Sequence, residues 1–350
     1  MTKNPVQGGI MKYLTVLAVT LVLASPVSGH HNAESGMDGD SVVAFEGTVT
    51  EFSWKNPHVH VFVETTNEHG EQVEWTLQMG ASAITLHRRG WTRDSLVSGD
   101  RVTIRGHPAR DGRPYAALLS IEKEGGLALA TVSGAPEVTA STSTLAGIWI
   151  ADRSMLIRYP GGMDGLFRAQ LKLTDKGKAA QAQYDPLSDE NPESTCIGRP
   201  TPASLVSTVL YPLFIQINEV EEIIVIRSEY FDRERTVYMD GREHPENGER
   251  FIEGHSIGRW EGDTLVVDTT NFADHRSPYQ AGVGSGAQKH VVERYQLTED
   301  GTRIELEFIL EDPEYLAEPL IHSRELIYSP HMEMFRFNCD LETTRRFLPR

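Results

Sequence analysis

Polar side chains that could bind a ligand or take part in catalysis are concentrated in one stretch of the second half of the chain. Asp240, Arg242 and His244 surround one predicted turn, and His255 and Arg259 follow on the next predicted strand. Residues an even number apart on a strand share a face, so His255 and Arg259 point the same way. A histidine beside a carboxylate can act as a general acid–base pair, and an arginine can hold an anion. The stretch therefore predicts either a ligand-binding site or an active site.

A later strand supplies further candidates, His290 and Glu293. If the face with His255 and Arg259 points into a barrel, the interior would be charged and suited to an anionic or hydroxylated small molecule. As an enzyme, it would be an isomerase, lyase or hydrolase with His255 as general base, Arg259 as anion stabiliser and His290 or Glu293 assisting. The alternative is that Trp260 points inward as core and Arg259 forms a surface ion pair of little energetic value.

A second set of histidines predicts a metal site. His58 and His60 alternate on a predicted strand, which places two imidazoles on one face about 7 Å apart. After the cleavage predicted below, His30 becomes the N-terminus and offers both its amine and its ring, followed by His31. Such nitrogen ligands suit copper. The alternative, that these are ordinary histidines at barrel ends or in solvent, stays open.

The N-terminus has the pattern of a secretory signal peptide over residues 1–29. Lys12 precedes an apolar run over residues 13–24, and the small residues Val27 and Gly29 occupy positions −3 and −1 of a cleavage site. The run is shorter than the ~20 residues that span a bilayer, so we expect no membrane span after cleavage. The predicted location is periplasmic or secreted.

The net charge indicates which partners to expect, and the cysteine content indicates a disulfide. The formal charge is −17, and loss of the two lysines of residues 1–29 takes the mature chain to −19. A chain this acidic repels phosphate backbones, so we expect no nucleic-acid partner. The only cysteines, Cys196 and Cys339, are predicted to form a disulfide in an oxidising compartment.

The strand pattern predicts a mainly β protein with two barrels in series. After a loose arm over residues 30–43, five short strands and one helix (residues 82–90) within 44–130 favour a small OB-like barrel. The small polar residues of 131–144 are typical of a linker. Evenly spaced strands over 145–345, with almost no helix between them, predict a larger antiparallel lipocalin-like barrel. The glycines of Gly282–Gly286 predict a flexible loop, placed to cover a barrel mouth.

Several motifs resemble a two-domain family of exported bacterial proteins of unassigned function. The first domain carries Trp54-Lys-Asn-Pro-His58, Leu86-His-Arg-Arg-Gly-Trp91 and Gly106-His-Pro-Ala-Arg-Asp-Gly112. The second carries Tyr238-Met-Asp-Gly-Arg-Glu-His-Pro245 and Gly254-His-Ser-Ile-Gly-Arg-Trp-Glu-Gly-Asp-Thr-Leu265. The resemblance implies compartment and fold, and it implies no reaction.

Together these observations predict an exported protein that binds a small molecule in a pocket of its C-terminal barrel. An enzyme that uses His255 and Arg259 in that pocket, and a copper-binding protein that uses the N-terminal histidines, are the alternatives. Copper, in the last of these, is the one cofactor that the sequence indicates.

Overall fold

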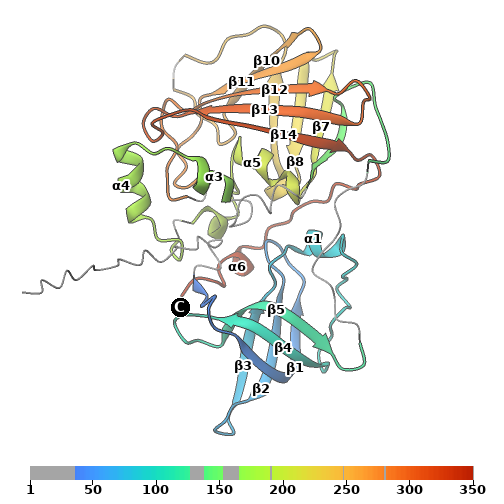
Figure 1. Ribbon diagram of the computed structural model, residues 1–350, viewed down its shortest axis with the longest axis vertical. Helices are drawn as coiled ribbons and strands as arrows, with labels where there is room; N and C mark the ends of the chain where they lie inside the picture. The colour runs from blue at the N-terminus through green and yellow to red at the C-terminus, as the bar shows by residue number, and fades with distance from the viewer. Residues whose placement is uncertain are drawn as a thin grey trace, which may run out of the picture.

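A computed structural model describes residues 36–126, 138–152, 165–189, 191–246, 248–279 and 281–349. The predicted signal peptide, His30, His31 and the first half of the predicted linker lie outside these residues. The described chain forms two closed β-barrels, one of five strands and one of nine. Figure 1 shows the larger barrel at one end of the molecule and the smaller one at the other. The prediction of a mainly β protein with a small and a larger barrel is confirmed.

The small barrel has the strand order β1-β2-β3-β5-β4, with β3 and β5 parallel. Its strands alternate as the sequence predicts, so Val61, Val63 and Leu77 are fully buried in one core. The short helix begins after Ser82, whose side chain accepts a hydrogen bond from the Thr85 amide and so caps it. The elements are β1 (Val43–Ser53), β2 (His60–Thr66), β3 (Gln72–Gln78), α1 (Ala83–His87), β4 (Arg101–Pro108) and β5 (Tyr115–Lys123).

The large barrel is a meander in which each strand pairs with the next, and β14 returns to β6. All its pairs are antiparallel except β9 with β10, which is parallel over two residue pairs. An odd number of alternating strands cannot close without one parallel pair, so the predicted antiparallel barrel needs this seam. The strands are β6 (Gly147–Ala151), β7 (Leu213–Asn218), β8 (Ile223–Ser228), β9 (Arg233–Tyr238), β10 (His255–Glu261), β11 (Thr264–Thr270), β12 (His290–Leu297), β13 (Arg303–Glu311) and β14 (Leu320–Tyr328).

Short helices close the end of the large barrel that faces the small one (Figure 1). Phe167 of α3 and Leu205 of α5 are buried in the same core as the strands. The longest of these helices, α4, begins after Thr174, whose side chain accepts a hydrogen bond from the Gly177 amide. The helices are α3 (Gly165–Gln170), α4 (Asp175–Gln183), η3 (Pro192–Thr195), α5 (Ala203–Val206), η4 (Ser207–Val209), η5 (Tyr230–Asp232) and α6 (Leu341–Thr344).

The C-terminal segment after β14 runs back to the small barrel and binds the two barrels together (Figure 1). Asn56 is central to this contact: its side chain accepts a hydrogen bond from the Ala83 amide and donates one to the Phe337 carbonyl. Cys196 and Cys339 form the predicted disulfide, with Cα atoms 5.8 Å apart. A disulfide is compatible with an oxidising compartment.

None of the helices in the described parts of the chain has the length and the apolar character needed to cross a bilayer.

Candidate functional site

The strand face that carries His255 and Arg259 lies on the outside of the large barrel. The opposite face of the strand points inward. Ser256 on that face is buried, and its hydroxyl lies 2.9 Å from the hydroxyl of Thr269 and 3.3 Å from the Arg235 guanidinium. Arg259 is exposed instead, and it pairs with Glu261 on the same strand. This direction is opposite to the one that an interior site built on His255 and Arg259 requires.

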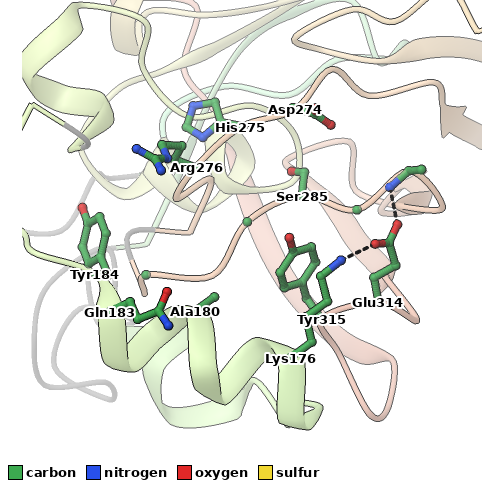
Figure 2. Close-up of a pocket in the computed structure, with 14 residues that line it drawn as sticks. Lys176, Ala180, Gln183, Tyr184, Asp274, His275, Arg276, Ser285, Glu314 and Tyr315 are labelled. Atoms are coloured by element: carbon green, nitrogen blue, oxygen red, sulfur yellow. Dashed lines mark hydrogen bonds and ion pairs between the residues drawn. The ribbon is translucent and has the colours of Figure 1, made fainter.

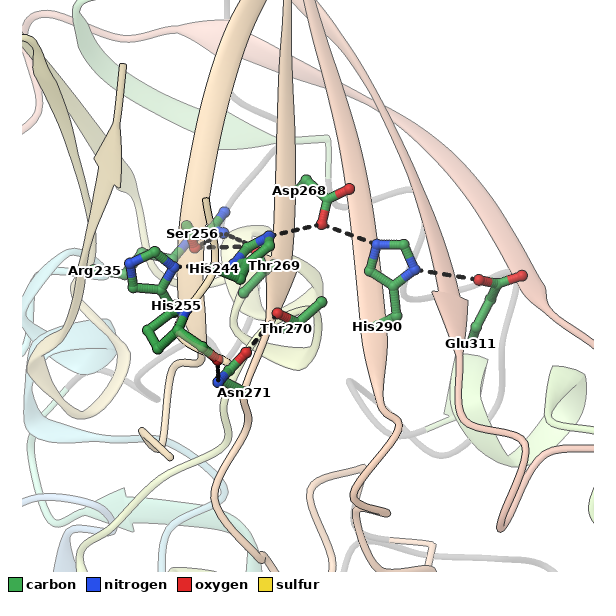
Figure 3. A network of polar contacts seen from close by, with 11 residues as sticks. Arg235, His244, His255, Ser256, Asp268, Thr269, Thr270, Asn271, His290 and Glu311 are labelled. Atoms are coloured by element: carbon green, nitrogen blue, oxygen red, sulfur yellow. Dashed lines mark hydrogen bonds and ion pairs between the residues drawn. The ribbon is translucent and has the colours of Figure 1, made fainter. Parts of the chain in front are cut away.

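The structure nevertheless brings three of the predicted histidines together in a hydrogen-bonded row, which we call the outer histidine row (Figure 3). The two Nδ1 atoms of His244 and His255 lie 2.9 Å apart. Asp268 of β11 connects them to β12, because its Oδ1 lies 3.2 Å from His244 Nε2 and 3.0 Å from His290 Nε2. His290 Nδ1 in turn lies 3.3 Å from a carboxylate oxygen of Glu311.

The environment of the outer histidine row drives two histidine pKa values apart. Burial and the neighbouring His244 lower the pKa of His255. The hydrogen bond that His290 donates to Asp268, with a contribution from Glu311, raises the pKa of His290. Relative to a free imidazole, His255 therefore favours its neutral form, which can accept a proton, and His290 favours its charged form, which can donate one.

The other predicted site residues lie apart from this row or at its edge. Arg242 pairs with Asp240, and its guanidinium lies 3.8 Å from the ring centre of Tyr238. Glu293 is fully buried inside the barrel, where it accepts hydrogen bonds from Arg235 and from the hydroxyl of Tyr295. Glu293 and His290 therefore lie on opposite faces of β12, as their odd spacing requires.

The predicted metal ligands of the first barrel have other contacts. His58 precedes β2, and His60 is its first residue. His60 is fully buried, with Nδ1 3.0 Å from the His58 carbonyl oxygen and Nε2 3.4 Å from the hydroxyl of Tyr115. Burial lowers the pKa of His60 to about 3. Within the described residues no group of three or more His, Cys, Asp or Glu side chains is arranged to hold a metal ion.

A cavity of about 540 Å³ lies at the helical end of the large barrel. Figure 2 shows α4 along one side, residues 274–276 along the other, and the glycine loop of Gly282–Gly286 between them. A volume of this size is within the ~300–1,000 Å³ of small-molecule sites. The cavity is lined by Lys176, Ala180, Gln183, Tyr184, Asp274, His275, Arg276, Gly282, Gly284, Ser285, Gly286, Ala287, Glu314 and Tyr315.

Hydrogen bonds connect one end of the glycine loop to the turn after β13. The amides of Gly286 and Ala287 each donate a 2.7 Å hydrogen bond, the first to Asp312 and the second to Glu314. Gly282 must be glycine, because its φ is +75° and a Cβ would lie 2.7 Å from Tyr184 Cβ. The loop forms one wall of the cavity.

Two side chains that line the cavity have polar atoms without a partner among the described residues. Ser285 is 7% exposed, and its hydroxyl makes no hydrogen bond to this part of the chain. The Nε2 atom of His275 bonds to the Gly198 carbonyl at 3.1 Å, while its buried Nδ1 finds no partner in the same described ranges. Buried polar groups are nearly always paired in folded proteins, so these two atoms have hydrogen-bonding capacity left for a further molecule.

A buried lysine lies next to the glycine loop. Lys289 Nζ donates a hydrogen bond to the Thr201 carbonyl at 2.8 Å and lies 4.0 Å from the ring centre of Phe272. Burial lowers the pKa of Lys289 to about 7. The amine of Lys289 thus contacts the Thr201 carbonyl and the face of the Phe272 ring. It is a titratable group next to the loop that lines the cavity.

Sequence reasoning missed the residues of this cavity. They come from segments that are far apart in the chain, and His275, Ser285 and Tyr184 belong to no motif with a recognisable spacing. The glycine-rich loop was the one available signal.

The first barrel is where the chain is similar to a known family. The sequence profile of a family of unknown function (DUF6152) matches residues 18–117. This match covers β1 to β4 and the start of β5, and it supports the resemblance noted for the first domain. A comparison with curated proteins found no match. The family match adds no chemistry, so function is argued from the site alone.

Proposed function

We propose that this protein is an exported small-molecule-binding protein whose ligand occupies the cavity between α4 and the glycine loop. The observation that carries the proposal concerns two residues that line one cavity, Ser285 and His275. Each has a buried side-chain atom, Oγ and Nδ1 respectively, with no hydrogen-bond partner in the described chain. Each of these atoms costs about 1–3 kcal/mol if it stays buried without a hydrogen bond. A ligand that supplies the missing partners removes this cost when it binds.

Binding is favoured over catalysis in this cavity because His275 is a poor proton carrier. Burial lowers the pKa of His275 to about 4. At neutral pH its imidazole is therefore uncharged and suited to accept a hydrogen bond, and it is a weak base. The predicted signal peptide and the disulfide support export to the periplasm or the exterior.

A ligand-detected NMR screen tests this proposal. The library contains small polyols, carboxylates, amines and apolar compounds, and the protein is the full mature chain. Ala180 lines the cavity whereas Ala179, its neighbour on α4, is exposed. Ala180→Trp should fill the cavity and abolish the signals of bound compounds, while Ala179→Trp should keep them. If no compound distinguishes these two variants, the cavity is not a binding site.

The outer histidine row favours a second function, acid–base catalysis on the barrel surface. The specific observation is that one hydrogen-bonded row holds His255, with a lowered pKa, and His290, with a raised one. Hydrolysis of 4-nitrophenyl acetate serves as the test. His255→Gln should abolish most of the turnover and His107→Gln, on the small barrel, should not. Equal rates in both variants would exclude a catalytic role for His255.

A further inference from the structure

The position of the proton on the His275 ring determines which kind of ligand group this residue can bind. A carbonyl oxygen only accepts, so the 3.1 Å contact with Gly198 requires a proton on His275 Nε2. In the neutral ring Nδ1 then carries a lone pair and no proton. His275, which lines the cavity, therefore has an acceptor nitrogen with no partner in the described chain, and a ligand that pairs with it must supply a donor.

Ser285 offers the complementary group. Its hydroxyl has no partner within the described ranges, so it can both donate and accept. Its amide donates a 3.0 Å hydrogen bond to the carbonyl of His275, which fixes the two residues relative to each other. A ligand hydroxyl can donate to His275 Nδ1, and a hydroxyl can equally accept from Ser285. Alcohol groups satisfy both residues without bringing a charge into the cavity.

The charges that line the cavity cancel. Lys176 Nζ lies 2.5 Å from a carboxylate oxygen of Glu314, and the other oxygen of Glu314 accepts from the Ala287 amide. Asp274 and Arg276 contribute one charge of each sign. An ionic ligand would lose part of its hydration here and meet a lining whose net charge is zero, which disfavours it.

From this pattern we infer that the cavity binds an uncharged small molecule with several hydroxyl groups, of the size of a mono- or disaccharide. The inference rests on the proposed function, since it assigns a ligand class to the same cavity. The neutral acceptor on His275, the Ser285 hydroxyl that is unpaired within the described chain, and the balanced charges each select for this class. The cavity volume of about 540 Å³ accommodates a molecule of this size.

Matched sugars of different charge test the ligand class. Glucose and lactose are the neutral probes. Glucuronate, which keeps the pyranose ring of glucose, is the anionic counterpart of glucose, and glucosamine is its cationic counterpart. We expect at least one neutral probe to bind about tenfold more tightly than the charged counterparts, and Ser285→Ala to weaken that binding about tenfold. The control is Ser207→Ala, because Ser207 is buried outside the cavity and its hydroxyl already donates to the Ser204 carbonyl. This variant should bind as the wild type does.

The outcomes separate the two proposals. If neither neutral probe binds up to its solubility limit, or if a charged counterpart binds equally well, the ligand class is wrong. The cavity itself still stands as a binding site if other library compounds bind to Ala179→Trp and not to Ala180→Trp. If no compound distinguishes those variants, the proposed function fails, and the ligand class fails with it.

Discussion

The guanidinium of Arg88 donates two hydrogen bonds, of 2.7 and 2.6 Å, to the carboxylate of Glu229. Arg88 follows α1 in the small barrel, and Glu229 follows β8 in the large one. The Glu229 side chain is fully buried and also accepts a 2.8 Å hydrogen bond from the Phe335 amide of the C-terminal segment. The two barrels and the C-terminal segment therefore meet at one buried carboxylate.

Removal of the arginine from this pair should destabilise the protein strongly. Arg88→Met leaves the buried carboxylate of Glu229 without its cation, which typically costs about 3–5 kcal/mol. Urea unfolding provides the measurement. Arg259→Met, which breaks only the exposed pair with Glu261, is the control and should cost less than about 1 kcal/mol. Similar losses in the two variants would contradict a stabilising role for the contact between the barrels.

Ser285→Ala should leave the free energy of unfolding unchanged or raise it by up to about 1 kcal/mol. The serine hydroxyl is buried and unbonded in the described chain, so its removal deletes a desolvation cost and breaks no hydrogen bond there. Ser207→Ala, which loses a 2.6 Å hydrogen bond to the Ser204 carbonyl, should cost about 1 kcal/mol. If Ser285→Ala is as destabilising as Ser207→Ala, the hydroxyl has a structural partner and is not reserved for a ligand.

Acid should destabilise the protein through His60. Its pKa in the folded state is about 3, below the value of about 6.5 in the unfolded chain. As the pH falls below about 6.5, the unfolded chain takes up a proton that the folded state does not, so the free energy of unfolding falls until the pH reaches the folded value. Urea unfolding at several pH values should show a shallower decline for His60→Gln. The same decline in both proteins would exclude His60 as its source.

Lys289 should make the free energy of unfolding depend on pH in the alkaline range. Its folded pKa of about 7 lies below the ordinary lysine pKa of 10.5, so the unfolded chain holds more protons between these values. The free energy of unfolding should rise as the pH increases from about 7 toward about 10. Lys289→Met should remove most of that rise, and an unchanged slope would contradict the lowered pKa. The pH slope is the readout, because the lost hydrogen bond to Thr201 affects stability at every pH.

The strands could be predicted from the sequence because alternation and hairpin turns are local signals. The sequence predicts evenly spaced strands over 145–345, and the described part of this range contains the strands β6 to β14 of the large barrel. The direction of the face with His255 and Arg259 could not be predicted. Each face of β10 mixes polar and apolar residues, with Ile257 beside the histidine and Trp260 opposite, so periodicity does not say which face is inside.

The residues of the cavity could not be predicted from the sequence for a different reason. Ser285 and His275 are informative because their polar atoms lack partners in the described chain, and this depends on what the rest of the fold places around them. The spacing of residues in the sequence does not show which buried atoms lack a hydrogen-bond partner in the fold. The glycine loop was visible, yet the carboxylates of Asp312 and Glu314 that hold it come from the turn after β13.

The most direct test of the ligand site is the nitrogen NMR spectrum of His275 in the labelled protein, recorded before and after addition of the tightest-binding neutral sugar. We predict that at neutral pH Nε2 carries the proton and Nδ1 does not, and that the Nδ1 resonance moves toward that of a hydrogen-bonded nitrogen as the sugar saturates the cavity. A proton on Nδ1 in the free protein, or a Nδ1 resonance that stays unchanged at saturation, would contradict the account.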